Sequence, residues 1–112
     1  MPREMQAVGK LYDFILWTLP IISRMPRSHK FTIGDRMENL LLDTLELLIE
    51  ATYTRDGKRD LLRRANLNLE KLRYLFRLCK DMDLVNLRRY EHASRCINEV
   101  GKLVGGWIKS QL

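Results

Sequence analysis

The stretch Lys58–Lys80, KRDLLRRANLNLEKLRYLFRLCK, contains the most regular apolar pattern in the 112-residue chain. Its apolar residues recur at alternating steps of three and four, namely Leu62, Ala65, Leu69, Leu72, Phe76 and Cys79. This spacing places the six side chains on one side of an α-helix and is typical of a helix in a bundle. The pattern therefore predicts an amphipathic helix over about 58–80.

Three more segments with helical periodicity surround this one, over about 4–25, 33–54 and 86–109. Pro26 ends the first of them, and Pro20 predicts a kink inside it. Thr32 and Asn86 are expected to cap the starts of the second and the last helix, and Gly57 to separate the middle two. Core positions in the first helix are expected at Leu11, Phe14, Ile15, Thr18, Ile21 and Ile22.

These four helices are joined by short connections, and no segment alternates apolar and polar residues as a half-buried strand does. Short connections between long amphipathic helices favour antiparallel neighbours. A chain of 112 residues is the size of one domain with one core. We therefore predict an all-α, up-down-up-down four-helix bundle that forms a single domain over 1–112.

The basic residues concentrate in the third predicted helix, where eight of them stand against two acidic residues. The rest of the chain has as many acidic as basic residues, and 35–56 is net acidic. An arginine-rich row on the outer side of a helix can neutralise phosphates, although it can also be a solvated face that aids solubility. The candidate nucleic-acid-binding residues are Arg59, Arg63, Arg64, Lys71, Arg73, Arg77 and Lys80.

Two of the predicted helices carry apolar residues on a second side. In the third helix these are Leu67, Tyr74 and Leu78; in the last, the row Ala93, Cys96, Val100, Leu103 and Trp107 lies beside the row Leu87, Tyr90, Ile97, Val104 and Ile108. Helices with two apolar sides favour self-association over a monomer with a few exposed apolar residues. We predict an oligomer interface at Leu67, Tyr74, Leu78, Leu103 and Trp107.

Three glycines, Gly101, Gly105 and Gly106, lie inside the last predicted helix, where each costs about 0.5–1 kcal/mol relative to alanine. Close approach of another helix backbone beside Trp107 would offset this cost. The alternative is fraying near the end of the helix.

No motif for phosphate-loop, hydrolytic or metal-dependent chemistry is present, so we expect no enzyme activity, no metal and no cofactor. Cys79 and Cys96 are expected to be reduced thiols, and His29 and His92 to be surface or capping residues. The apolar run Leu11–Ile22 contains Asp13 and Pro20 and is too short to span a membrane. We expect a soluble, cytoplasmic protein that has no association with membranes.

The chain resembles the accessory variability determinant proteins of diversity-generating retroelements, a four-helix-bundle family related to proteins encoded in intervening sequences of ribosomal RNA genes. The resemblance spans nearly the whole chain. It rests on PRS at 26–28, FTIG at 31–34, ENLL at 38–41, LRRAN at 62–66, LEKLR at 69–73, YEHASR at 90–95, EVGK at 99–102 and GGWIK at 105–109.

This resemblance implies a homopentameric barrel of four-helix bundles with a basic surface. It also implies binding to the retroelement reverse transcriptase and to RNA or DNA, in support of mutagenic reverse transcription and retrohoming. Of the candidate residues, Arg63, Arg64, Lys71 and Arg73 lie in the matched motifs. The alternative is a structural or regulatory helical oligomer, such as a ribosomal intervening-sequence protein, without specific nucleic-acid binding.

Overall fold

The computed structural model describes residues 2–111, apart from the side chain of Arg3. Four long helices make up most of this part of the chain, and a short helical segment precedes the second of them. The elements are α1 (Arg3–Ser23), α2 (Arg27–His29), the π-helical turn η1 (Lys30–Gly34), α3 (Asp35–Tyr53), α4 (Lys58–Asp81) and α5 (Leu87–Lys109).

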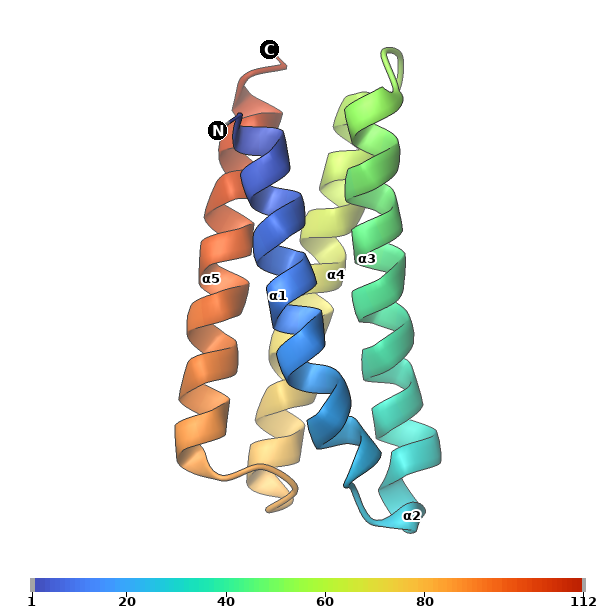
Figure 1. The fold of residues 1–112 in the computed structure, drawn as a ribbon, viewed down its shortest axis with the longest axis vertical. Helices are drawn as coiled ribbons and strands as arrows, with labels where there is room; N and C mark the ends of the chain where they lie inside the picture. Colours follow the sequence, from blue (N-terminus) through green and yellow to red (C-terminus); the bar gives the residue numbers. More distant parts are fainter. Residues whose placement is uncertain (1, 112) are drawn as a thin grey trace.

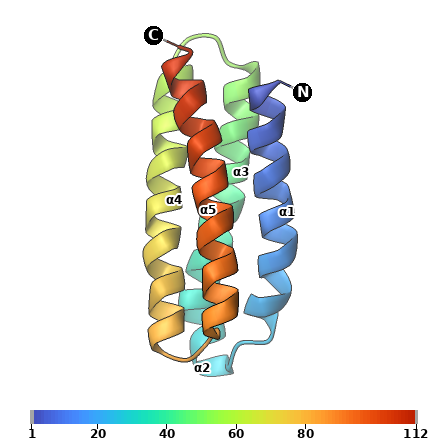
Figure 2. The same ribbon diagram turned by 90° about the vertical axis from the view of Figure 1, so that its left-hand side faces the viewer.

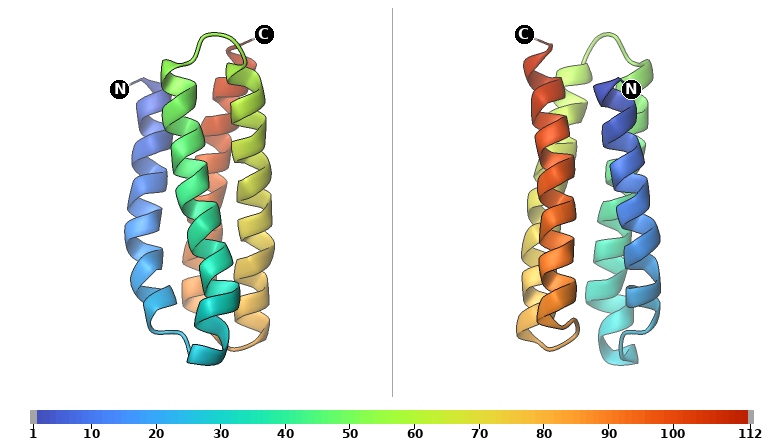
Figure 3. Two further views of the ribbon diagram at one scale, coloured as in Figure 1. Left: turned by 90° about the vertical axis from the view of Figure 1, so that its right-hand side faces the viewer. Right: turned by 60° about the vertical axis from the view of Figure 1, so that its left-hand side comes forward.

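The long helices run alternately up and down and pack side by side along the molecule (Figure 1). Neighbouring pairs are α1 with α3, α3 with α4, α4 with α5, and α5 with α1. Figure 2 shows α5 in front of α3, and the left view of Figure 3 shows the reverse, so these two helices lie diagonally across the bundle. The prediction of an all-α, antiparallel four-helix bundle is confirmed.

The core contains the residues that the periodicity of the first and third predicted helices indicates. The apolar row of α4 from Leu62 to Cys79, which we call its seam, is buried at all six positions. The six expected core positions of α1 are also buried. Phe14 of α1 meets Phe76 of α4 across the bundle, with ring centroids 5.6 Å apart. The hydroxyl of buried Thr18 donates to the backbone oxygen of Phe14 at 2.8 Å, which allows this polar side chain to remain inside the core.

The two apolar rows predicted for α5 are not two sides of the helix. The buried residues are Ala93, Ile97, Val100, Val104 and Trp107, which alternate between the two predicted rows. Steps of four and three along this set form one buried row, to which the first predicted row contributes three residues and the second contributes two. Trp107 is fully buried within the chain, so its predicted place on an exposed interface is wrong, and Leu103 packs half-buried against the core.

Leu87 also differs from the prediction, because it is 61% exposed rather than in the core. It is the first residue of α5, directly after the cap, and the buried residues of this helix begin at Ala93. The cap itself is confirmed, since the side-chain oxygen of Asn86 accepts the backbone N–H of Arg89 at 2.8 Å. Gly57 separates α3 from α4 with a φ of 82°, a conformation that favours glycine.

The expected cap at Thr32 is wrong. The helical stretch begins directly after Pro26, and Thr32 lies inside η1, where its hydroxyl donates to the backbone oxygen of His29 at 3.2 Å. Gly34 explains why the chain can pack tightly here: a Cβ at this position would lie 3.0 Å from Cγ2 of Ile22. The close approach of η1 to α1 therefore favours a glycine, because a larger residue would push the Ile22 side chain aside.

Substitutions at Trp107 and Leu87 test the revised seam of α5. We expect Trp107→Ala to lower the free energy of unfolding by about 3–5 kcal/mol, because it removes the largest fully buried side chain of the core. Leu87→Ala, a matched change at an exposed position of the same helix, is expected to cost less than about 1 kcal/mol. Urea unfolding followed by circular dichroism measures both, and equal losses would contradict the assigned seam.

Candidate nucleic-acid interface

The seven basic candidates on α4 do not form one continuous row. Arg64 and Lys71 are on the side that faces α3, where they line a hollow together with Asp43, Glu46 and Glu50 of that helix. Arg73 and Lys80 are on the other side, against α5. The acidic side chains of α3 therefore lie beside only one of the two basic groups and weaken the positive potential there.

On the side facing α5, the basic residues make several surface contacts. Arg73 donates from Nη1 to Oδ1 of Asn98 at 2.7 Å and from Nε to Oε1 of Glu70 at 3.2 Å. Lys80 Nζ lies 4.8 Å from the ring centroid of Tyr90 and 3.4 Å from a carboxylate oxygen of Asp81. Exposed pairs of this kind contribute only about 0–1 kcal/mol, so these cations can readily exchange partners.

Arg59 and Arg63 are exposed, and neither is within 4.0 Å of a carboxylate oxygen among the residues the structure describes. Arg77 has one distant partner, Asp81, at 3.9 Å. These three arginines are the part of the predicted site that is most accessible to a phosphate.

A second row of basic residues, on α5, is absent from the sequence-based prediction. Its members are spaced by seven residues, are all exposed, and make no ion pair with a described carboxylate; they are Arg88, Arg95, Lys102 and Lys109. The seven-residue spacing could have revealed the row, because it repeats one helical face. The net charge of the residues outside α4 does not reveal the row, because acidic residues elsewhere in the chain balance it.

The neighbouring helices α4 and α5 thus form one basic side of the bundle. Helix α5 has five basic and two acidic residues, and one of these acids, Glu99, contacts Lys10 of α1 at 3.4 Å. Helix α3 is acidic, with five carboxylates and one arginine, and lies diagonally opposite α5. Positive charge is therefore concentrated on the side of the bundle formed by α4 and α5, and negative charge on α3.

The predicted interface residues of α4 are on the surface: Leu67, Tyr74 and Leu78 are 57%, 66% and 42% exposed. A second exposed apolar surface, which the sequence reasoning missed, surrounds a hollow between α1 and α3 and includes Met5, Tyr12, Ile49 and Tyr53. No helix of the described chain approaches Gly101 or Gly105, since a Cβ at either would meet nothing within 4 Å. The close approach of another helix backbone expected at these glycines is therefore not seen within the described chain.

Both cysteines are free thiols. Burial raises the pKa of the Cys79 thiol to about 11, and its Sγ lies 3.5 Å from Sδ of Met37. Burial also raises the pKa of Cys96, aided by Glu99 and opposed by Arg95 and Lys10. Within residues 2–111 no three metal-ligating side chains gather at one point, and no helix there is long and apolar enough to cross a bilayer.

The fold and its charge distribution define a helical-bundle protein with one polycationic side. The chain belongs to the bAvd-like family, whose model matches residues 5–111. This match confirms the resemblance to accessory variability determinant proteins inferred from the sequence motifs.

The fold is similar to that of a solved protein of unknown function from the S23 ribosomal protein family of Bacteroides thetaiotaomicron VPI-5482. The TM-score is 0.87 at 16% identity, and the match covers 96% of this chain and 99% of the other. At this identity the similarity supports the fold alone. No curated protein matches the sequence.

The raised pKa of Cys79 predicts a loss of stability at alkaline pH. Above the ordinary thiol pKa of 9.0 the unfolded chain loses this proton, whereas the folded chain keeps it up to about pH 11. Stability should therefore fall across this window, by about 1 kcal/mol per pH unit from this group. Urea unfolding at several pH values measures the slope. Cys79→Ala is the control because it removes only this thiol, and an unchanged slope in this variant would contradict the assignment.

Proposed function

We propose that the chain is a non-enzymatic accessory factor of a diversity-generating retroelement. In this role it binds the reverse transcriptase and the template RNA through its basic side, and so supports mutagenic reverse transcription and retrohoming in the cytoplasm. The observation that carries the proposal is membership of the bAvd-like family over residues 5–111.

The distribution of charge supports binding to a polyanion. Clustered, exposed arginines and lysines on adjacent helices can neutralise successive phosphates and release their counterions. In α4 the favoured contacts are Arg59, Arg63, Arg73, Arg77 and Lys80, which lie outside the acidic hollow. Arg64 and Lys71 remain part of the proposed site, although the carboxylates of α3 reduce their contribution. RNA is the proposed ligand, and DNA would meet the same cations.

The chain is proposed to act as a homopentameric barrel. Each subunit presents two different apolar surfaces, one on α4 around Tyr74 and one between α1 and α3 around Tyr12. Contact between unlike surfaces of successive subunits builds a ring when the rotation closes. The number five comes from the family resemblance, and the two surfaces support self-association of this head-to-tail kind.

Charge reversal on α4 tests nucleic-acid binding. We expect the variant Arg63→Glu, Arg64→Glu, Lys71→Glu, Arg73→Glu to bind RNA about 100-fold or more weakly. We also expect a flatter dependence of binding on salt, by about 0.7 in the log–log slope for each single-strand phosphate that the variant no longer neutralises. The variant should also fail to retain the reverse transcriptase in a pull-down. Fluorescence anisotropy over a salt series measures the first two effects.

The matched control reverses four basic residues that lie outside α4 and α5. The variant Arg27→Glu, Lys30→Glu, Arg36→Glu, Arg55→Glu has the same net charge and should retain most of the affinity. Equal reductions in the two variants would show that net charge alone governs binding. Negligible RNA affinity of the unmodified protein, with assembly that changes with salt, would support the rival role of a purely structural oligomer.

Assembly is tested by Tyr74→Glu, which places a charge in the middle of the exposed apolar row of α4. Light scattering is expected to give about five times the 13.3 kDa chain mass for the unmodified protein and a smaller particle for the variant. Lys102→Glu, an exposed change outside both apolar surfaces, serves as the control. An unmodified protein that is monomeric at micromolar concentration would overturn the proposed ring.

A further inference from the structure

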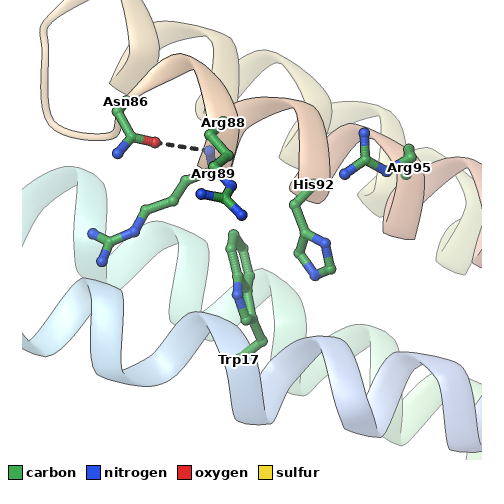
Figure 4. Close-up of a pocket in the computed structure, with 6 residues that line it drawn as sticks. All are labelled: Trp17, Asn86, Arg88, Arg89, His92 and Arg95. Atoms are coloured by element: carbon green, nitrogen blue, oxygen red, sulfur yellow. Dashed lines mark hydrogen bonds between the residues drawn. The ribbon is translucent and has the colours of Figure 1, made fainter.

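A hollow of about 500 Å³ lies between α1 and α5 near the start of α5, on the opposite side of the bundle from the acidic hollow of α3 and α4 (Figure 4). None of the seven basic candidates of α4 contributes to it. Its lining residues are Trp17, Asn86, Arg88, Arg89, His92 and Arg95.

The hollow is strongly cationic. Three of the six lining residues are arginines, and none of the six is acidic. No guanidinium of the three is within 4.0 Å of a carboxylate oxygen in the described chain. Glu91 lies on α5 between Arg88 and Arg95 but is not within 4.0 Å of either guanidinium. Asp13 and Glu99 line the adjoining hollow, and Glu99 already contacts Lys10. An anion bound here would relieve the mutual repulsion of the three cations.

Two aromatic rings line the same hollow. The indole of Trp17 rises from α1 toward the turn of α5 that carries the arginines, and the ring of His92 lies beside it with the centroids 4.5 Å apart. Phe14 stacks against the indole from the core side at 6.0 Å, and Sγ of Cys96 lies 3.4 Å from Nε2 of His92. These contacts hold the pair of rings in place while leaving both half-exposed.

Asn86 fixes the backbone at the rim of the hollow. Its side-chain oxygen accepts the N–H of Arg89 at 2.8 Å, so this donor of the first turn of α5 is already used. A bound anion would therefore be held by the guanidinium groups, which bind phosphate oxygens in a bidentate manner.

We propose that this hollow binds one nucleotide of single-stranded RNA, with its phosphate on the arginines and its unpaired base against Trp17 and His92. The inference rests on the proposed function and adds a specific site to it. Arginine beside exposed aromatic rings is the combination that proteins use to hold unpaired bases. A base inside a duplex stays stacked on its neighbours and cannot enter a hollow between two helices.

The rest of α5 favours RNA over an acidic peptide. Arg88 and Arg95 at the hollow are the first two members of the exposed row that continues to Lys102 and Lys109. Seven residues of α-helix advance about 10 Å, so the row provides cations along the whole length of the helix. Such a row matches a continuous polyanion that leaves the hollow, and the aromatic rings offer a stacking surface that an unpaired base uses and a carboxylate does not.

Binding of a labelled single-stranded oligouridylate and of a labelled blunt-ended RNA duplex, measured by anisotropy, tests the inference. We expect Trp17→Leu to weaken single-strand binding about tenfold and duplex binding less than twofold, because only an unpaired base uses the ring. The single strand should also quench tryptophan fluorescence in the unmodified protein but not in this variant, whose remaining Trp107 is buried. Leu16→Ala, at the exposed neighbouring position, is the control.

A second variant, Arg88→Gln with Arg95→Gln, changes only exposed side chains and keeps the test valid if Trp17→Leu fails to fold. It should weaken single-strand binding at least tenfold, whereas Arg36→Gln with Arg55→Gln, which removes the same charge elsewhere, should change it less than threefold.

Single-strand affinities of both hollow variants within twofold of the unmodified protein would overturn the site and leave the proposed function intact. An unmodified protein that binds no RNA would overturn both. Binding of a glutamate-rich peptide that depends on Arg88 and Arg95, with no competition from RNA, would also overturn the nucleotide site.

Discussion

The structure depends on the burial of one apolar row from each long helix. The row of α4 from Leu62 to Cys79 is buried along its whole length, and the largest fully buried side chains are Phe76 of this row, Phe14 of α1 and Trp107 of α5. At about 25 cal/mol per Å² of buried apolar surface, this packing is the main favourable contribution to folding. Because one face of each helix satisfies the core, the outer faces of α4 and α5 are free to carry charge without loss of the fold.

Burial of this kind was predictable wherever the spacing was regular. Leu62, Ala65 and Leu69 belong to a row that keeps steps of three and four over the whole helix, whereas Leu67, Tyr74 and Leu78 make a shorter row, so the buried side was predictable. In α5 the residues Cys96, Leu103 and Ile108 broaden the apolar set, and the half-buried flanks of the seam then resembled a second face. Only the packing of α5 between α1 and α4 shows that Trp107 belongs to the centre.

The candidate site was predictable in part for a related reason. Summing charge by segment identified α4, where basic residues are dense, but missed α5, where Arg88, Arg95 and Lys102 are regular and sparse. Two features depend on which helices are neighbours. One is that only some of the α4 cations lie beside acidic α3, and the other is the contact between Trp17 and His92. Sequence periodicity predicts which face of its helix a residue occupies, but it does not predict which other helix packs against that face.

The central claim is that nucleic acid lies across the basic side formed by α4 and α5, away from acidic α3. Ultraviolet cross-linking of single-stranded RNA to the assembled protein, followed by mass spectrometry of the cross-linked peptides, tests it most directly. The account predicts cross-links in peptides from α4, α5 and the part of α1 that contains Trp17. Cross-links concentrated in α3, or spread evenly over all four long helices, would contradict it.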